Sequence, residues 1–417
     1  MTGNVSNQRR WTLFSILCLA GVFNAMDRPI IAILKPDMMA DFGWTNADFG
    51  NLAAVTQFSA ALAFLVTGWL VDRLGVNRSM HVGVSAWSLA AMAHGWALTT
   101  WHVVAARVGL GVTEAVQTPL TIKTVATLFE PDRRSLAFGV ATFLAGAGTI
   151  GMPFVVPWLA ETMGWRGALI IGGVGGFVSL LLWIWMARGV HFNSGAEDAE
   201  QDVSDDGAPY GPILLERRTW AIVIAKMLSD ATWWLINFWL PDFYRNNFDL
   251  STRELAIPLG LAFAGSAIGA LIAGAVSTRL LEQGWSVNRV RKSVMLVSAL
   301  IVTPLPFVLN LNSFWPVAIM MGVVMAGHQG FSLSLFSTIT DVVPRAKVGR
   351  VTAFGAFAGN MGGVAISLIT GYVLDAKLGY FPLFLFAAAS YLIAFAWFHA
   401  MLPTITRDTG SRAAVLT

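Results

Sequence analysis

The stretch FNAMDRPIIAILKPD, residues 23–37, places an acidic and a basic residue inside an otherwise apolar run. The stretch RVGLGVTEAVQTP, residues 107–119, does the same with an arginine and a glutamate. Ionisable groups inside a membrane-crossing segment are rare, and they face the protein interior or a water-filled path. We therefore expect a site for a small organic anion and its accompanying proton, built around Asp27, Arg28, Arg107 and Glu114.

The composition of the chain excludes a soluble globular protein. Of its 417 residues, 56% are hydrophobic and only 12% are charged, and the mean hydropathy is +0.64. A soluble domain carries about 25% charged residues, whereas apolar runs of about 20 residues match the roughly 30 Å core of a bilayer. The sequence pI of about 9.2 comes from basic residues in short loops, so it indicates membrane topology rather than nucleic-acid binding. The single cysteine, Cys18, excludes an internal disulfide.

Polar breaks divide the chain into twelve apolar segments, which predict an all-α membrane protein. The segments lie near residues 11–33, 49–71, 79–99, 102–126, 135–160, 165–186, 219–242, 255–278, 293–311, 315–338, 350–374 and 381–402. One long break carries NSGAEDAEQDVSDDGAP, whose acidic composition is typical of a solvated linker. We therefore expect an N-terminal six-helix bundle, a cytoplasmic linker and a C-terminal six-helix bundle, at residues 1–187, 188–218 and 219–417.

The placement of lysine and arginine predicts which side of the membrane each loop faces. Of the 27 such residues, 18 fall in loops or termini on one side, five on the other and four within segments. Cytoplasmic loops carry the excess of basic residues, so we expect both termini in the cytoplasm. In this count Lys35 belongs to the outer side, and the first apolar segment is retained rather than cleaved.

A motif recurs at corresponding places of the two halves, which is typical of a duplicated six-helix unit. GWLVDRLGVNR begins at Gly68, and GAVSTRLLEQGWSVNR begins at Gly274. We expect both glycines to let the loop pack closely on a neighbouring helix. Asp72 either caps a helix or pairs with an arginine across the interface of the halves. The predicted gating-loop residues are Gly68, Asp72, Arg73, Arg78 and Arg279.

GWLVDRLGVNR resembles the cytoplasmic loop signature of the major facilitator superfamily, and the six-plus-six plan covers nearly the whole chain. Three further stretches resemble bacterial hexuronate and sugar-acid transporters of the anion:cation symporter family. They are DATWWLINFWLPDF, EQGWSVNRVRK and GHQGFSLSLFSTITDVVPRAKVG, at residues 230–243, 282–292 and 327–349. The chain departs from these relatives at Thr278, where many have Asp, and at Gln57–Phe58–Ser59, where relatives often carry a Tyr. The resemblance implies a transporter of the bacterial inner membrane, in which two bundles rock about a midplane site.

Arg107 and Glu114 are seven residues apart, so they share one face of a helix. A guanidinium binds a carboxylate with two parallel hydrogen bonds and stays charged, which suits a sugar acid. A buried glutamate accepts a proton readily because removal from water disfavours its charged form. We hypothesise that an arginine holds ionised Glu114 and that protonation frees this arginine for the substrate; the resemblance implies the same role for the pair. The alternative is a structural ion pair that orders the helix.

Asp27 and Arg28 are adjacent, so their side chains point about 100° apart and face different neighbours. Pro29 follows directly and loosens the backbone hydrogen bonding. The resemblance implies that Asp27 is a second proton site and that Arg28 contacts the substrate or a helical partner, with structural pairing of Arg28 as the alternative. With a monoanionic substrate, one proton per cycle makes transport electroneutral and two make it electrogenic.

The second half offers hydroxyl, amide and aromatic groups that suit a polyhydroxylated substrate. From the resemblance we expect Gln329 to contact sugar hydroxyls, whereas His328 either relays a proton or fixes helix packing. Asn360 carries both a donor and an acceptor, and Trp234 either stacks on a sugar ring or belongs to an interfacial belt. The predicted substrate-binding set is Arg28, Arg107, Gln329, Ser334, Asn360 and Trp234, with His328, Gln57, Ser332 and Thr338 as further candidates.

No P-loop and no cluster of Cys and His residues is present in the sequence, so we expect neither ATP hydrolysis nor a metal, and no cofactor beyond coupling protons. We expect Lys123 to reach the lipid head groups and Lys226 to pair with Asp230. The prediction is a monomeric, non-enzymatic proton symporter of a hexuronate, aldonate or similar organic anion, embedded in the bilayer and without a nucleic-acid partner. The alternatives are a symporter of another carboxylate, such as an aromatic acid, and a non-transporting sensor on the same fold.

Overall fold

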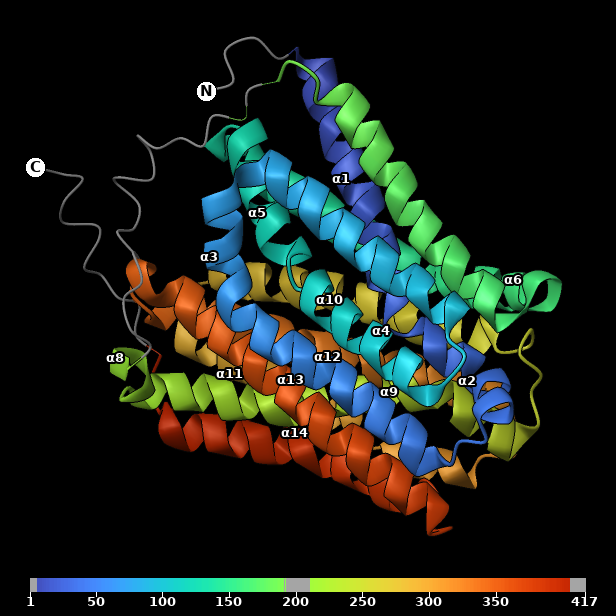
Figure 1. The fold of residues 1–417 in the computed structure, drawn as a ribbon. Helices are drawn as coiled ribbons and strands as arrows, with labels where there is room; N and C mark the ends of the chain where they lie inside the picture. The colour runs from blue at the N-terminus through green and yellow to red at the C-terminus, as the bar shows by residue number, and fades with distance from the viewer. Residues whose placement is uncertain (1–5, 191, 193–210, 406–417) are drawn as a thin grey trace, which may run out of the picture. The chain divides into compact units, whose positions relative to one another are not determined.

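The computed structural model describes residues 6–190, 192 and 211–405, and these residues form helices and their connections without a strand (Figure 1). The prediction of an all-α protein is therefore confirmed. Most of the predicted linker, residues 188–218, lies outside the described residues.

The first half contains helices that are longer or more broken than the predicted segments. They are α1 (Asn7–Asp27), α2 (Ile30–Phe42), α3 (Asn46–Ala93), the 3-10 helix η1 (His94–Trp96), α4 (Thr100–Glu114), α5 (Gln117–Leu128) and α6 (Pro131–Met186). The pair α1 and α2 is bent by 42° and together corresponds to the first segment. In the same way, α4 and α5 correspond to the fourth.

Two of these helices each contain two segments joined at a glycine. α3 changes direction at Gly75, where φ is +73°, and α6 does so at Gly164, where φ is +70°. Positive φ is open to glycine without steric cost, so the chain reverses at these points (Figure 1). α3 therefore supplies the second and third segments, and α6 the fifth and sixth.

The second half contains one helix for most segments. They are α8 (Gly211–Leu214), α9 (Arg217–Phe248), α10 (Ala256–Glu282), α11 (Val287–Val302), the 3-10 helix η2 (Leu305–Asn310), α12 (Phe314–Val342), α13 (Arg345–Asp375) and α14 (Phe381–Met401). α9 to α14 correspond to the last six segments, with η2 completing the ninth. Twelve helical spans therefore account for the described chain.

The chain falls into two compact units. Unit 1 comprises residues 1–201, 237–260 and 367–375, and unit 2 comprises residues 202–236, 261–366 and 376–417. The core of unit 1 contains the fully buried Trp87 and Trp183 among aliphatic and phenylalanine side chains. In unit 2, α10 packs closely on α12, because Gly265 and Gly269 face the backbone of Gly322 and Ala326. Small residues at such crossings let membrane helices approach each other.

The structure contradicts the predicted close packing of two glycines and the predicted environments of two lysines. A Cβ added at Gly68 would meet nothing within 4 Å, and one at Gly274 would reach only Leu333 at 3.8 Å, so neither glycine is required for close packing. The glycine that the first motif requires is Gly75, which ends one helical half and begins the next. The two charge predictions concern Lys35 and Lys123; the former is buried, and the latter pairs with a carboxylate.

Candidate functional site

The break between α1 and α2 in unit 1 positions the first charged residues. Pro29 has no backbone N–H, α1 ends at Asp27, and α2 begins at Ile30. Arg28 therefore lies in the break, and its Nε donates a hydrogen bond of 2.5 Å to Oε2 of Glu114 on α4. The side chain of Glu114 is fully buried and that of Arg28 is 15% exposed. The partner of Glu114 in this structure is thus Arg28, from the break between α1 and α2.

Arg107 lies on α4 and is fully buried. Its Nη1 donates to the backbone carbonyl of Asp27 at 3.3 Å, a carbonyl that the end of α1 leaves without a helical partner. Its Nε and Nη2 have no hydrogen-bond partner among the described residues. Unpaired buried guanidinium nitrogens are costly, so this arrangement suits an anion that accepts from both.

The two adjacent residues Asp27 and Arg28 diverge, as expected from their sequence spacing. Arg28 reaches α4, whereas the carboxylate of Asp27 lies beside Gly172 of α6, where an added Cβ would be 3.3 Å from Oδ1. Oδ2 of Asp27 and Oε1 of Glu114 are buried without a hydrogen-bond partner in the described part of the chain. The site therefore holds two carboxylates and two guanidinium groups, and each carboxylate keeps one oxygen that no described residue contacts by a hydrogen bond.

Sequence reasoning missed two amides in this region. Asn24 lies one turn before Asp27 on α1, and its Nδ2 is buried without a described partner. Gln117 begins α5, its Nε2 would lie 3.0 Å from a Cβ at Gly21, and its Oε1 is also unpartnered. Both amides lie within one helical turn of Asp27 or Glu114 in the sequence, and this spacing could have identified them as site residues. Gln57, a predicted candidate, is fully buried on α3 with both amide atoms unpartnered among the described residues.

Lys35 was counted as a charge of an outer loop, and this prediction is wrong. It lies in α2, is 1% exposed, and donates to Asp242 of α9 at 2.5 Å and to Asn46 at 2.7 Å. The ammonium group also lies over the rings of Trp239 and Phe49, at 4.3 and 5.2 Å from their centroids. The chain buries this lysine because a carboxylate, an amide and two ring faces replace its water.

Unit 2 contains a buried ion pair on α9. Lys226 donates to Asp230, one helical turn later, at 2.7 Å, which confirms the predicted pairing. Lys226 also donates to the hydroxyl of Ser332 on α12 at 3.2 Å and lies over the ring of Phe336. The backbone of Gly359 approaches Asp230 so closely that a Cβ there would be 2.2 Å from Oδ2. The pair therefore connects α9, α12 and α13.

His328 forms a chain of hydrogen bonds rather than facing an open space. Its Nδ1 is 2.5 Å from the hydroxyl of Tyr391, which donates to the backbone carbonyl of Ser229 at 3.1 Å. A carbonyl only accepts, so Tyr391 accepts from His328, and Nδ1 carries the proton. Trp233 stacks on the imidazole with a centroid distance of 4.9 Å. These contacts orient the imidazole ring and favour a packing role.

The other candidate binding residues of unit 2 differ in their burial and in the hydrogen bonds that their polar groups already form. Asn360 donates to the carbonyl of Ala356, and its Oδ1 is buried without a described partner. Thr338 is buried and donates to the carbonyl of Ser334 within α12. Trp234 and Gln329 are half-buried. The indole of Trp234 lies against Gly363, where a Cβ would be 2.5 Å from Cδ1.

The predicted gating loop has its own contacts within unit 1. Lys123 was expected to reach lipid head groups and instead pairs with Asp72 at 3.0 Å. Asp72 therefore pairs with a lysine of its own unit. Arg73, Arg78 and, in unit 2, Arg279 are exposed.

Residues 17–285 match the sequence model of the Major Facilitator Superfamily, and this range exceeds half of the chain. The chain belongs to the major facilitator superfamily. Its membership, and relatives that are named transporters, identify it as a transporter rather than an enzyme.

Relatives and solved structures of this major facilitator protein cover nearly its whole length. It is 23% identical over 408 residues to the D-galactonate transporter of Escherichia coli O6:H1, covering 93% of this chain and 94% of the relative. It is 23% identical to the hexuronate transporter of Escherichia coli K12, covering 90% of each. A bacterial homologue of the human lysosomal transporter Spinster superposes with a TM-score of 0.75 at 16% identity, over 95% of this chain and 97% of that one. A D-xylose–proton symporter gives a TM-score of 0.71 at 14% identity, over 94% and 98%. The structures show the shared fold.

Within the described residues of this superfamily member, no group of three or more His, Cys, Asp or Glu side chains is placed to hold a metal ion. The side chains that the structure brings together at the site carry guanidinium, carboxylate and amide groups.

Proposed function

We propose that this chain transports a sugar acid, such as a hexuronate or aldonate, across the bacterial inner membrane together with protons, with both termini in the cytoplasm. Support for the substrate class comes from the relatives, which are named for D-galactonate, hexuronate and L-galactonate. The observation that carries the proposal is the buried guanidinium of Arg107, whose Nε and Nη2 lack partners among the described residues. A carboxylate accepts from two such nitrogens at once.

In the proposed mechanism, Arg28 changes partner. With no substrate bound, ionised Glu114 accepts from Arg28, as the 2.5 Å contact depicts. Protonation of Glu114 removes the negative charge that holds the guanidinium, and Arg28 then joins Arg107 in binding the carboxylate of the substrate. Asp27 takes up a second proton. Release of the substrate returns Arg28 to Glu114, so protons and anion move together.

The polar groups of unit 2 support a polyhydroxylated substrate. Asn360 keeps a buried acceptor, and half-buried Gln329 and Trp234 offer an amide and a ring face. In the proposal these residues bind hydroxyls, whereas His328 positions α9 and α14 through Tyr391 and Ser229. Ser332 is engaged by Lys226 and fixes the ion pair of this unit.

Uptake by the purified protein in liposomes tests the proposal. Glu114→Gln is expected to abolish accumulation driven by a pH gradient while keeping exchange of labelled for unlabelled substrate, because the amide cannot release a proton. Glu161→Gln, which removes an exposed glutamate of α6, is the matched control and should accumulate substrate as the wild type does. Active accumulation by Glu114→Gln would contradict the proposed coupling.

A binding screen across uronates, aldonates and aromatic acids identifies the substrate class. Arg107→Ala is expected to lose binding of every carboxylate ligand by at least tenfold, since a bidentate guanidinium contact is removed. If the protein binds an aromatic acid more tightly than every sugar acid, its substrate is an aromatic acid rather than a sugar acid. Specific binding without any flux in liposomes would indicate a sensor. An unchanged affinity of Arg107→Ala would remove this residue from the site.

A further inference from the structure

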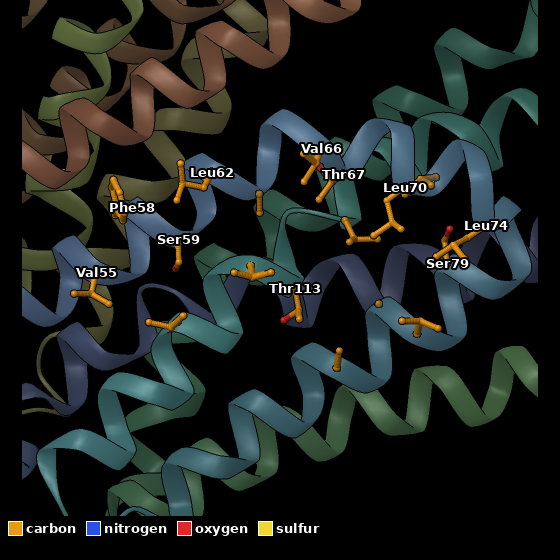
Figure 2. Close-up of a pocket in the computed structure, with 18 residues that line it drawn as sticks. Val55, Phe58, Ser59, Leu62, Val66, Thr67, Leu70, Leu74, Ser79 and Thr113 are labelled. Atoms are coloured by element: carbon orange, nitrogen blue, oxygen red, sulfur yellow. The ribbon is translucent and has the colours of Figure 1, made fainter. Parts of the chain in front are cut away.

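A groove of about 620 Å³ in unit 1 is lined by none of the four charged residues of the candidate site. It is formed by the two halves of α3 together with Val108, Val112, Thr113 and Val116, and we refer to it as the α3–α4 groove (Figure 2). None of its 18 lining residues is charged, and only Ser59, Thr67, Ser79 and Thr113 are polar. The hydroxyl groups of Ser59 and Thr113 already donate to backbone carbonyls of their own helices, so they need no hydrogen bond from a ligand. A sugar acid therefore finds no partner here, whereas a hydrocarbon chain does.

One wall of the groove is a continuous apolar stripe. Phe58, Leu62, Val66, Leu70 and Leu74 recur at every fourth residue of α3 and follow one another along the groove (Figure 2). Phe58, Leu62 and Val66 are about half exposed. The 16 helical steps from Phe58 to Leu74 span about 24 Å at the rise of about 1.5 Å per residue. One leaflet of hydrocarbon is about 15 Å thick, so the groove is long enough for a whole acyl chain.

Two arginines are the direct sequence neighbours of Leu74 and Ser79, which line one end of the groove. Exposed Arg73 and Arg78 flank the break at Gly75. The guanidinium of Arg73 lies 5.4 Å from the ring of Trp69, which is 60% exposed, and tryptophan favours the level of the lipid head groups. Lys123 and Asp72 neutralise each other by pairing, and neither Arg73 nor Arg78 forms a salt bridge with a described residue.

An unsatisfied hydroxyl lies at the same end. Ser79 is 1% exposed and lines the groove, and its Oγ has no hydrogen-bond partner among the described residues. A buried hydroxyl without a partner is costly. An ester or phosphate oxygen at the mouth would accept from it, immediately next to the two arginines.

We propose that the α3–α4 groove binds one acyl chain of an anionic phospholipid, whose head group contacts Arg73, Arg78 and Ser79. The occupant is a membrane lipid because the chain spans a bilayer, the groove is apolar along its length, and its charged end is cationic. Two arginines at the membrane surface favour an anionic over a zwitterionic head group by a factor on the order of ten. The lipid comes from the leaflet that contains the loop of Gly68 to Arg78, which is the cytoplasmic leaflet in the proposed orientation.

Native mass spectrometry of the full chain tests the site, with phosphatidylglycerol and phosphatidylcholine of identical acyl chains added at equal concentration. The wild type is expected to retain one phosphatidylglycerol about tenfold more tightly than phosphatidylcholine. Ala86→Trp fills the groove and should lose this retention, whereas Leu89→Trp, on the same half of α3 but outside the lining, should keep it. Equal retention by folded Ala86→Trp and the wild type would overturn the proposal.

The head-group contact has its own control. The double variant Arg73→Gln/Arg78→Gln should bind the two lipids equally, whereas Arg279→Gln/Arg289→Gln in unit 2 should keep the preference; Arg289 also stacks on a tryptophan, Trp285, at 3.9 Å. If Ala86→Trp fails to fold, the wild type still decides the question through chain length: retention should fall at least tenfold from sixteen-carbon to eight-carbon chains. If retention does not depend on the charge of the lipid head group, or does not depend on the length of the acyl chain, the groove is not the proposed lipid site. The readout requires no transport, so its failure leaves the proposed function untouched.

Discussion

Single residues show how this chain carries charge inside a membrane. Lys35 keeps its ammonium group between the carboxylate of Asp242, the amide of Asn46 and the faces of Trp239 and Phe49. Burial of a charge is tolerated when such partners replace water, and removing one partner leaves the other charge uncompensated.

We expect Lys35→Met to destabilise unit 1 by about 3 kcal/mol, because the buried carboxylate of Asp242 loses the ammonium group that contacts it. Lys35→Met/Asp242→Leu should recover most of this loss, since both charges are then absent. The exposed pair of Arg166 and Asp41 is the matched control, and Arg166→Ala should cost about 1 kcal/mol or less. Unfolding in detergent, followed by tryptophan fluorescence, measures these differences. A double variant as unstable as Lys35→Met would show that packing, not charge, decides the effect.

The sequence indicated which residues are buried charges more readily than which partners they have. Asp27, Arg28, Arg107 and Glu114 stand out because each interrupts an apolar run. The contact of Arg28 with Glu114 spans 86 positions, and that of Lys35 with Asp242 spans 207, so helical periodicity carries no information about either. Lys226 and Asp230 were paired correctly because four residues separate them on one helix.

Helices of this protein pack through their small residues, and the contacts distinguish structural glycines from others. A Cβ at Gly265 of α10 would lie 2.1 Å from the carbonyl oxygen of Gly322 on α12, whereas one at Gly274 of the same helix meets only Leu333 at 3.8 Å. The backbone of Gly322 cannot move aside as a side chain can.

We expect Gly265→Ala to lower stability by about 1–3 kcal/mol, because α10 and α12 must separate. Gly274→Ala should be neutral or slightly stabilising, since alanine favours a helix over glycine by up to about 1 kcal/mol. Thermal unfolding of the two purified variants in one detergent compares them directly. A destabilised Gly274→Ala alongside an unaffected Gly265→Ala would contradict the assigned packing.

A charged group connects the start of α9 with α13 outside the membrane-spanning segments. Glu216 accepts from Arg218 at 2.5 Å and from Lys347 at 2.6 Å. Partial burial raises the pKa of Glu216, but the hydrogen bonds and charges of Arg218 and Lys347 outweigh it and lower the pKa below its ordinary value. A lowered pKa in the folded state stabilises the protein above the pKa of the unfolded chain, about 4.3, and this contribution is lost as the pH falls through the folded-state value.

We therefore expect the wild type to lose stability relative to Glu216→Gln as the pH falls from about 5 towards 3. Near pH 7 the variant should be less stable by about 1 kcal/mol or less, because all three side chains are partly exposed. The difference between the two unfolding temperatures, measured across this pH range, is the relevant quantity. A difference that stays constant with pH would exclude Glu216 as its source.

At the scale of helices, apolar segments predicted the spans but not the breaks. The residues between α1 and α2, and the positive φ of Gly75 and Gly164, set the direction of each helix. Many glycines in the chain show an ordinary helical φ, so the sequence alone did not mark these two. The superfamily was recognisable because its loop motif combines glycine, acid and base at fixed spacing.

The whole molecule is expected to move net charge if both proposed proton sites are used. A monoanion that enters with two protons, on Asp27 and Glu114, carries one positive charge inward per cycle. A membrane potential of 100 mV then supplies about 2.3 kcal/mol to uptake. A single proton would leave the cycle electroneutral, and the potential would have no effect.

We expect liposomes with an inside-negative potassium diffusion potential and equal pH on both sides to accumulate substrate through the wild type. Asp27→Asn removes one proton site, so this variant should respond to a pH gradient but not to the potential. Glu114→Gln should accumulate under neither condition, because the partner change of Arg28 depends on protonation of Glu114. Liposomes without valinomycin, and therefore without potassium-selective permeability, serve as the zero-potential control. Wild-type uptake that is indifferent to the potential would limit the cycle to one proton and leave Asp27 a structural role beside Gly172.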